Sequence, residues 1–302
     1  MMNISYIDPL LAAIRRMSAA LFKPFDIGKW FTVGFSAFLA GLLDGGGGNF
    51  NWGMKDNKFD ISYIEELPYT IREWVIDHQG WAIVILIGIF LLIALLVIFN
   101  WLSSRGKFIF LENVIHNNRF IRKPWAEYGP QADSLFVWRL IYGVVSFVVI
   151  FGIIAYGIYY FPELKLLSLI GIGILLLFLF IICGYVSLFL NDFIVPIMYK
   201  NRITANQAWI IFLKLLNERP APFILYGFLI FFLIIVIVIT IAILGFLTCC
   251  IGFVLIALPY IGSVILLPLS YAARAFGVQF LEQFGTAFTL FPKEEENKNP
   301  VV

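Results

Sequence analysis

The sequence predicts an all-α membrane protein, a polytopic bundle of about six transmembrane helices with amphipathic helices at the interface. Hydrophobic residues make up 61% of the 302 residues and charged residues only 13%, whereas a soluble domain is about half apolar and a quarter charged. Several apolar runs also reach the roughly 20 residues that a helix needs to cross a bilayer. We therefore predict a single integral membrane domain over residues 1–290 and a disordered tail over residues 291–302.

Six segments are predicted to span the membrane. Four are plain from composition, namely residues 81–102, 135–160, 166–190 and 223–247. A fifth, residues 250–274, contains Pro259 and Pro268, which should kink it or shorten its helical part. The sixth, residues 27–43, is at the short limit and is either a tilted span or a re-entrant element. We predict a span, because the basic residues of the following segments then fall mainly on the inner side of the membrane.

The distribution of basic residues predicts the orientation. With the N-terminus inside, 17 Lys and Arg residues lie on the inner side and 4 on the outer side. Short cytoplasmic loops of membrane proteins carry such an excess. We therefore expect a multi-pass protein of the cell membrane with both termini in the cytoplasm.

The connections between spans are predicted to lie at the membrane interface. An N-terminal helix carries Arg15 and Arg16 beside an apolar stripe, which suits an anionic inner leaflet or a simple anchor. The members of this stripe are Ile7, Leu10, Leu11, Ile14, Met17 and Leu21. The first outer loop, residues 44–80, is acidic and contains a further amphipathic segment.

Two inner connections resemble each other weakly and predict a duplicated span–linker–span unit. Residues 110–125 and 193–209 each begin with Phe, continue with Asn-Arg eight and nine residues later, and end with Trp. In the second connection Thr204 and Gln207 form a capping box, the pattern that opens a helix. Pro220 and Pro222 then end that helix.

Polar residues are scarce within the predicted spans, and the ionisable groups lie near their inner ends. The tentative polar cluster at the inner face consists of Asp192, Arg274, Arg139, Glu112 and Glu282. Asp192 with Arg274 is the pair that best suits a site. The alternative is that these side chains snorkel or form ion pairs at the interface. No catalytic, cofactor-binding or metal site is predicted, since His78 and His116 fall on opposite sides of the membrane.

Cys249 and Cys250 occupy the predicted outer turn between the last two spans. A metal there would need further ligands on the same side, and a disulfide between neighbours would be far from the usual Cα separation of about 4.4–6.8 Å. We therefore interpret the two cysteines as part of an apolar turn flanked by Gly245 and Gly252.

The C-terminal half carries a family resemblance. The segment "LTCCIGFVLIALPYIGSVILLPLSYAARAFGVQFLEQFG" (247–285), with "WLSSRGKFIF", "SLFVWRL" and "NDFIVPIMY", resembles a group of uncharacterised bacterial and archaeal multi-span proteins. That group looks related to the membrane domain attached to some glycerophosphoryl diester phosphodiesterases. The resemblance implies a helical membrane module. It does not imply the phosphodiesterase activity, which belongs to a separate soluble barrel.

The sequence favours a non-enzymatic membrane module whose partners are membrane lipids and a membrane or cytoplasmic protein. A net charge of only +2 gives no reason to expect nucleic acid. A permease or lipid-handling transporter is the alternative, and it would be supported if Asp192, Arg274 and Asn100 lined a cavity. An intramembrane enzyme would need carboxylates or histidines close together within the bilayer, and the sequence shows no such pattern.

Overall fold

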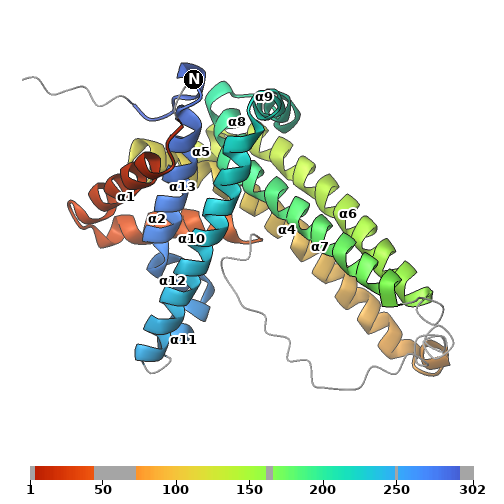
Figure 1. Ribbon diagram of the computed structural model, residues 1–302. Coiled ribbons are helices and arrows are strands. Elements are labelled where there is room, and N and C mark those ends of the chain that lie inside the picture. Colours follow the sequence, from red (N-terminus) through yellow and green to blue (C-terminus); the bar gives the residue numbers. More distant parts are fainter. Residues whose placement is uncertain (1–3, 44–72, 161–165, 249–250, 293–302) are drawn as a thin grey trace, which may run out of the picture. The chain divides into compact units, whose positions relative to one another are not determined.

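The computed structural model describes residues 4–43, 73–160, 166–248 and 251–292, and every named element in these ranges is a helix (Figure 1). This confirms the predicted all-α fold. Contacts divide the chain into two compact units. Unit 1 comprises Met1–Gly48, Trp101–Arg139 and Gly184–Val302, and unit 2 comprises Asn49–Asn100 and Leu140–Cys183. Most of the acidic loop, Cys249, Cys250 and the predicted tail from residue 293 lie outside the described residues.

Four long apolar helices match the four plain spans of the sequence. They are α4 (Gln79–His116), α6 (Gly129–Tyr159), α7 (Leu166–Phe189) with its continuation to Asn201, and α10 (Pro220–Leu247). Each is long and apolar enough to cross a membrane. The 38 residues of α4 measure about 57 Å at 1.5 Å per residue, well beyond a hydrocarbon core of about 30 Å. The helices therefore continue past the spans into the connections.

The segment predicted as the first span forms a shorter helix. After α1 (Ile7–Phe22), α2 (Ile27–Gly41) has only 15 residues. A helix that crosses a bilayer needs about 20. Asp26 starts α2, since its Oδ1 accepts hydrogen bonds from the backbone N–H of Gly28 at 2.8 Å and Lys29 at 3.2 Å. The predicted count of six spans is corrected to four, or up to five, among the described residues.

The segment predicted as the last span is broken into α11 (Ile251–Ala257), α12 (Pro259–Ile265) and α13 (Leu267–Glu282). Pro259 and Pro268 lie in the first turns of α12 and α13, where a missing N–H costs no hydrogen bond. Helices α12 and α13 meet at a bend of 65° and together form the fifth candidate span. The expected effect of the prolines is confirmed, and the continuous span over residues 250–274 is corrected.

The two resembling connections each turn at a left-handed residue and then hold a short helix. The turns lie at Asn117 and Arg202, both with φ of 52°, and the helices are α5 (Arg122–Glu127) and α9 (Ala205–Glu218). The capping box of α9 is confirmed, because the backbone N–H of Thr204 donates to Gln207 Oε1 at 3.1 Å. The shared order of elements is the one that a duplication predicts, and the duplication itself stays a prediction.

Unit 1 holds an aromatic core and several close helix crossings. Figure 1 shows α1 and α2 beside α13, which both helices contact. Phe193 and Tyr226 lie fully buried with ring centroids 5.0 Å apart. A Cβ on Gly106 of α4 would lie 2.5 Å from the backbone nitrogen of Ala40, so glycine allows α4 to cross α2 at backbone distance.

Unit 2 contains the most apolar stretches of α4 and α6. No residue in those stretches is buried, and side chains such as Leu86, Phe90 and Phe147 are about two-thirds exposed. Within this unit Cys183 Sγ lies 4.0 Å from Ser146 Oγ. The exposed apolar surface has the composition of a lipid-facing surface.

Candidate functional site

A π-helical turn interrupts the helix that runs from α7 into α8 (Val195–Asn201). This turn, η1, covers Leu190–Ile194 and contains Asn191 and Asp192. Single π-turns inside α-helices are frequent at functional sites. The sequence supplies a cause four residues after Asp192, where Pro196 lacks the N–H of a regular helical hydrogen bond and its ring crowds the preceding turn.

The π-turn shifts the backbone hydrogen bonds around Asn191. The N–H of Val195, which would bond to the Asn191 carbonyl in an α-helix, donates to the carbonyl of Leu190 instead. The next residue, Pro196, has no N–H to offer. The guanidinium of Arg274 on α13 reaches this turn, with Nη1 donating to the Asn191 oxygen at 2.5 Å. Arg274 therefore links α13 to the backbone of the π-turn.

Side chains from two more helices reach the same turn. Lys107 of α4 is 1% exposed, and its Nζ donates to Asn191 Oδ1 at 2.5 Å. The hydroxyl of Tyr226 on α10 donates to Asp192 Oδ2 at 2.8 Å. Four elements, α4, η1, α10 and α13, thus meet through one buried polar network. Asp192 and Arg274, the pair that the sequence indicated as best suited to a site, both belong to this network.

Glycine permits the close approach of α13 to this turn. A Cβ on Gly277 would lie 3.0 Å from the Cβ of Asp192. Gly277 follows Arg274 by three residues, so the two lie on the same face of α13. The helix therefore presents a small residue where it closely approaches Asp192 and a cation that donates to the Asn191 carbonyl.

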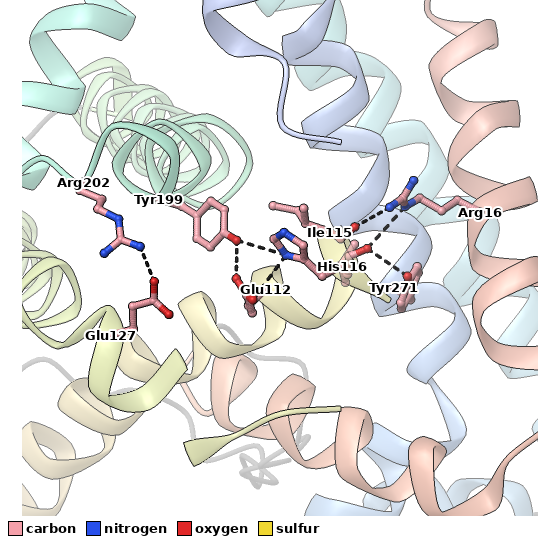
Figure 2. A network of polar contacts seen from close by, with 9 residues as sticks. Arg16, Glu112, Ile115, His116, Glu127, Tyr199, Arg202 and Tyr271 are labelled. Carbon is pink, nitrogen blue, oxygen red and sulfur yellow. Dashed lines mark hydrogen bonds and ion pairs between the residues drawn. The ribbon is translucent and has the colours of Figure 1, made fainter. Parts of the chain in front are cut away.

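Glu112 lies in a second polar group, near the C-terminal end of α4 (Figure 2). The hydroxyl of Tyr199 donates to Glu112 Oε2, and His116 Nδ1 lies 3.4 Å from Glu112 Oε1. The ring of Tyr128 stacks on Tyr199 with centroids 4.6 Å apart. Burial raises the pKa of Tyr128 above its ordinary value. This group joins α4, α8 and the turn between α5 and α6.

Arg139 and Glu282, the two remaining predicted site residues, hold other parts of unit 1. Arg139 Nη1 donates to Ser103 Oγ at 3.0 Å and to Ser104 Oγ at 3.3 Å, which links α6 to α4. Glu282 Oε1 accepts hydrogen bonds from the backbone N–H of Leu290 and Phe291, each at 2.7 Å. The structure brings Asp192 and Arg274 to one turn. The described contacts of Glu112, Arg139 and Glu282 are with other segments of the chain.

Arg16 has a different role from the one that the sequence predicts. Its Nη2 donates to the carbonyl of Ile115 at 2.5 Å and its Nε to that of Val114 at 3.4 Å. Tyr271 donates to the Val114 carbonyl as well, at 3.1 Å (Figure 2). These are carbonyls in the last turn of α4, where a cation is favoured. Arg16 therefore caps the end of another helix, a contact that the sequence analysis did not predict.

Sequence reasoning also missed Lys107, Tyr226 and Tyr271. One local signal was available, an Asn-Asp pair followed by Pro196 at helical spacing, which marks a disturbed turn. Nothing local identifies Lys107 and Tyr226, which reach this turn from other helices. The same holds for Tyr271, which donates to the Val114 carbonyl at the end of α4.

A pocket of about 530 Å³ lies between α10 and the broken α11–α12–α13 segment. Its lining is almost entirely aliphatic, with Ile237, Leu255 and Leu269 among the contributors. The hydroxyls of Thr240 and Thr248 in its wall bond to carbonyls of their own helix. The pocket is therefore apolar. None of the five predicted site residues lines it.

Metal ligands do not cluster in the described part of the chain. There, no group of three or more His, Cys, Asp or Glu side chains is placed to hold a metal ion. Cys249 and Cys250 lie outside the described residues, so the interpretation of their turn stays a prediction.

The fold and the polar contacts define a class of protein, an all-α protein with several apolar helices of membrane-spanning length joined by buried polar networks. The chain belongs to the Family of unknown function (DUF7544), whose family model matches residues 4–291. Comparison with curated proteins and comparison with solved structures each give no match. The finer resemblance to the membrane domain of some glycerophosphoryl diester phosphodiesterases stays a prediction.

Proposed function

We propose that this protein is a non-enzymatic integral membrane module that binds a lipid or protein partner. The observation that carries the proposal is the use of three buried or partly buried cations. Lys107 and Arg274 bind the π-turn, and Arg16 binds the end of α4. In each case the cation joins helices of the same chain. Such contacts stabilise a scaffold and leave its exposed surfaces for partners.

Membrane insertion is supported by the apolar exposure of the long helices. No residue in the most apolar stretches of α4 and α6 is buried, and monomeric soluble proteins rarely expose apolar patches above a few hundred Å². Hydrocarbon is the solvent in which such a surface costs nothing.

A lipid-handling transporter is the second candidate, and one observation favours it. The aliphatic pocket of about 530 Å³ lies beside the bend of 65° between α12 and α13. Broken helices are a common feature of transporter binding sites. The site of such a transporter would be this pocket, because Asp192 and Arg274 do not line it.

The test is purification in native membrane discs followed by mass spectrometry of bound lipids and proteins. The module proposal expects a reproducible protein partner at stoichiometric level or enrichment of one lipid class, with the lipids chemically unchanged after incubation. Chemical conversion of a bound lipid would contradict the non-enzymatic role. Release of the protein from membranes by alkaline carbonate would contradict insertion.

A matched pair of variants separates the two candidates. Ile241→Trp fills the aliphatic pocket, and Ile235→Trp places the same bulk on an exposed part of α10 outside the pocket lining. Movement of labelled lipid between leaflets of vesicles that is lost only in Ile241→Trp would favour the transporter. The module proposal expects neither variant to change such movement.

A further inference from the structure

Helix α1 has two apolar faces, and only one of them is covered by protein. Pro9, Ala13, Ala20 and Leu21 are buried, on a helix that lies against α13. The exposed side chains are Ile7, Leu11, Ile14 and Phe22, between 43% and 67% accessible. Their spacing of four, three and eight residues places them on one stripe of a helix.

The exposed stripe continues past the end of α1. Phe25 is 60% and Ile27 64% exposed in the segment that leads into α2. The six residues of the apolar stripe predicted from the sequence do not all face the same way. Leu21 faces the protein interior, whereas Ile7, Leu11 and Ile14 face outward.

A distant segment of the chain joins this surface. Arg119 Nη1 forms an ion pair with Asp26 Oδ2 at 2.9 Å, and Lys29 Nζ donates to Asn117 Oδ1 at 2.6 Å. These contacts place the connection between α4 and α5 beside the corner between α1 and α2. That connection contributes Phe120, which is 57% exposed.

The combined surface is rich in exposed cations. We call it the basic-aromatic surface, and its apolar members are Ile7, Leu11, Ile14, Phe22, Phe25, Ile27 and Phe120. Its exposed cations are Arg15, Lys23, Arg119, Arg122 and Lys123. Asp8 and Asp26 are its acids, and Asp26 is paired with Arg119. Arg16 contributes nothing, because it binds the end of α4.

We propose that the basic-aromatic surface binds the headgroups of anionic phospholipids at the membrane interface. The inference rests on the proposed function and deepens it by naming the partner of this surface. Exposed aromatic and aliphatic side chains enter the boundary between headgroups and acyl chains. Basic side chains beside them attract anionic lipid phosphates. An acidic protein segment would match the cations, yet it would leave the long apolar stripe unused.

The test measures lipid contact at two positions of the full-length protein. A fluorophore is attached to a cysteine that replaces Phe25 or Phe120, in a variant whose native Cys183, Cys249 and Cys250 are replaced by Ser. The protein is placed in nanodiscs of phosphatidylglycerol and phosphatidylcholine in equal amounts, with brominated acyl chains on one lipid or the other. We expect at least twofold stronger quenching by brominated phosphatidylglycerol at both positions.

A matched pair of charge reversals tests the role of the cations. Arg122→Glu with Lys123→Glu replaces two positive charges of the basic-aromatic surface by negative ones. Lys214→Glu with Arg219→Glu makes the same change in net charge on and after α9. The preference for phosphatidylglycerol should disappear in the first variant and persist in the second. Equal loss in both variants would overturn the proposal, because a general charge effect would then explain the preference.

Other outcomes overturn the proposal as well. Absence of quenching by either lipid would place a protein or water on this face, and equal quenching by both would show apolar contact without selection for anions. Resistance to carbonate extraction is measured on the same samples. If extraction resistance is retained while quenching fails, the lipid surface is wrong and the membrane module stands. If both fail, the proposed function fails too.

Discussion

Arg274 donates a hydrogen bond to the backbone carbonyl of Asn191 at the point where the chain passes from α7 into α8 as a π-turn. In this turn the N–H of Val195 bonds to the Leu190 carbonyl and Pro196 has no N–H, and Arg274 supplies a charged donor from another helix. An irregular turn in one helix and a buried cation in another thus depend on each other.

Replacing Arg274 should destabilise the protein through this carbonyl. Arg274→Met keeps much of the side-chain volume and removes the charged donor to the Asn191 oxygen, at a cost of about 1.5–3 kcal/mol. Thermal unfolding in a fixed detergent measures the loss. Arg122→Met, an exposed arginine on α5, is the control and should change stability much less.

A double-mutant cycle identifies the origin of the loss. Pro196→Ala restores a backbone N–H near the Asn191 and Asp192 carbonyls. We expect the cost of Arg274→Met to fall by at least half in the Pro196→Ala background, since the carbonyl gains a second donor. Fully additive effects of the two substitutions would contradict this account of the π-turn.

Tyr226→Phe tests the other side of the same turn. The substitution removes the hydroxyl that donates to Asp192 at 2.8 Å and keeps the ring packed against Phe193 and Phe280. The lost hydrogen bond to a carboxylate corresponds to about 1.5–3 kcal/mol. Unfolding of Tyr156→Phe, at an exposed position of α6, provides the comparison. Equal stability of the two variants would show that the hydroxyl contributes nothing.

Two neighbouring arginines should respond differently to the same substitution. Arg16→Ala removes the cap from the last turn of α4 and its packing against Phe291, whose ring centroid lies 3.8 Å from the guanidinium carbon. Loss of a charged donor to these carbonyls should cost about 1.5–3 kcal/mol. Arg15→Ala, exposed on the same helix, should leave the unfolding temperature nearly unchanged. A similar loss for both would contradict the assigned role of Arg16.

The helices of this fold were predictable because their signals are local. Long apolar runs identified α4, α6, α7 and α10, and Pro259 and Pro268 predicted the breaks that start α12 and α13. The length of α2 was not predictable from charge distribution, because that pattern assigns sides and does not set how far a helix extends. Asp26 as the N-cap of α2 was visible only in the structure.

The candidate site was only partly predictable because its contacts join distant segments. Asp192 and Arg274 stood out as rare charges near span ends, yet Lys107 and Tyr226 reach the same turn from other helices. Arg15 and Arg16 are indistinguishable in composition. Which of two adjacent side chains faces the interior depends on the rotation of α1 against α13, and no local pattern fixes that rotation.

Topology is predicted by the positive charges and can be tested at the adjacent cysteines. Cys249 and Cys250 should react with a membrane-impermeant thiol reagent from the outer side only, and Cys183, within the fourth-span region of the sequence, should be protected. Sealed vesicles of both orientations, with mass spectrometry of the labelled peptides, provide the measurement. Labelling of Cys249 and Cys250 from the cytoplasmic side would reverse or reject the predicted orientation.

Gly106→Ala should destabilise the protein, because it adds a methyl group where α4 crosses α2. The added Cβ of Gly106→Ala would lie 2.5 Å from Ala40 N and 2.6 Å from Leu39 C, and neither backbone atom moves without shifting α2. Overpacking of this kind costs about 1–3 kcal/mol, and the hydrogen bond from Ser103 Oγ to the Ala40 carbonyl at 2.9 Å would be strained as well.

Gly143→Ala is the matched control on α6, because a Cβ there meets nothing within 4 Å. In an open helical position alanine is favoured over glycine by about 0.5–1 kcal/mol, so this variant should unfold at the same or a higher temperature. Opposite signs for the two substitutions would support a backbone-distance crossing of α2 and α4. A neutral Gly106→Ala would mean that the two helices can separate without loss, and the crossing would then carry no stability.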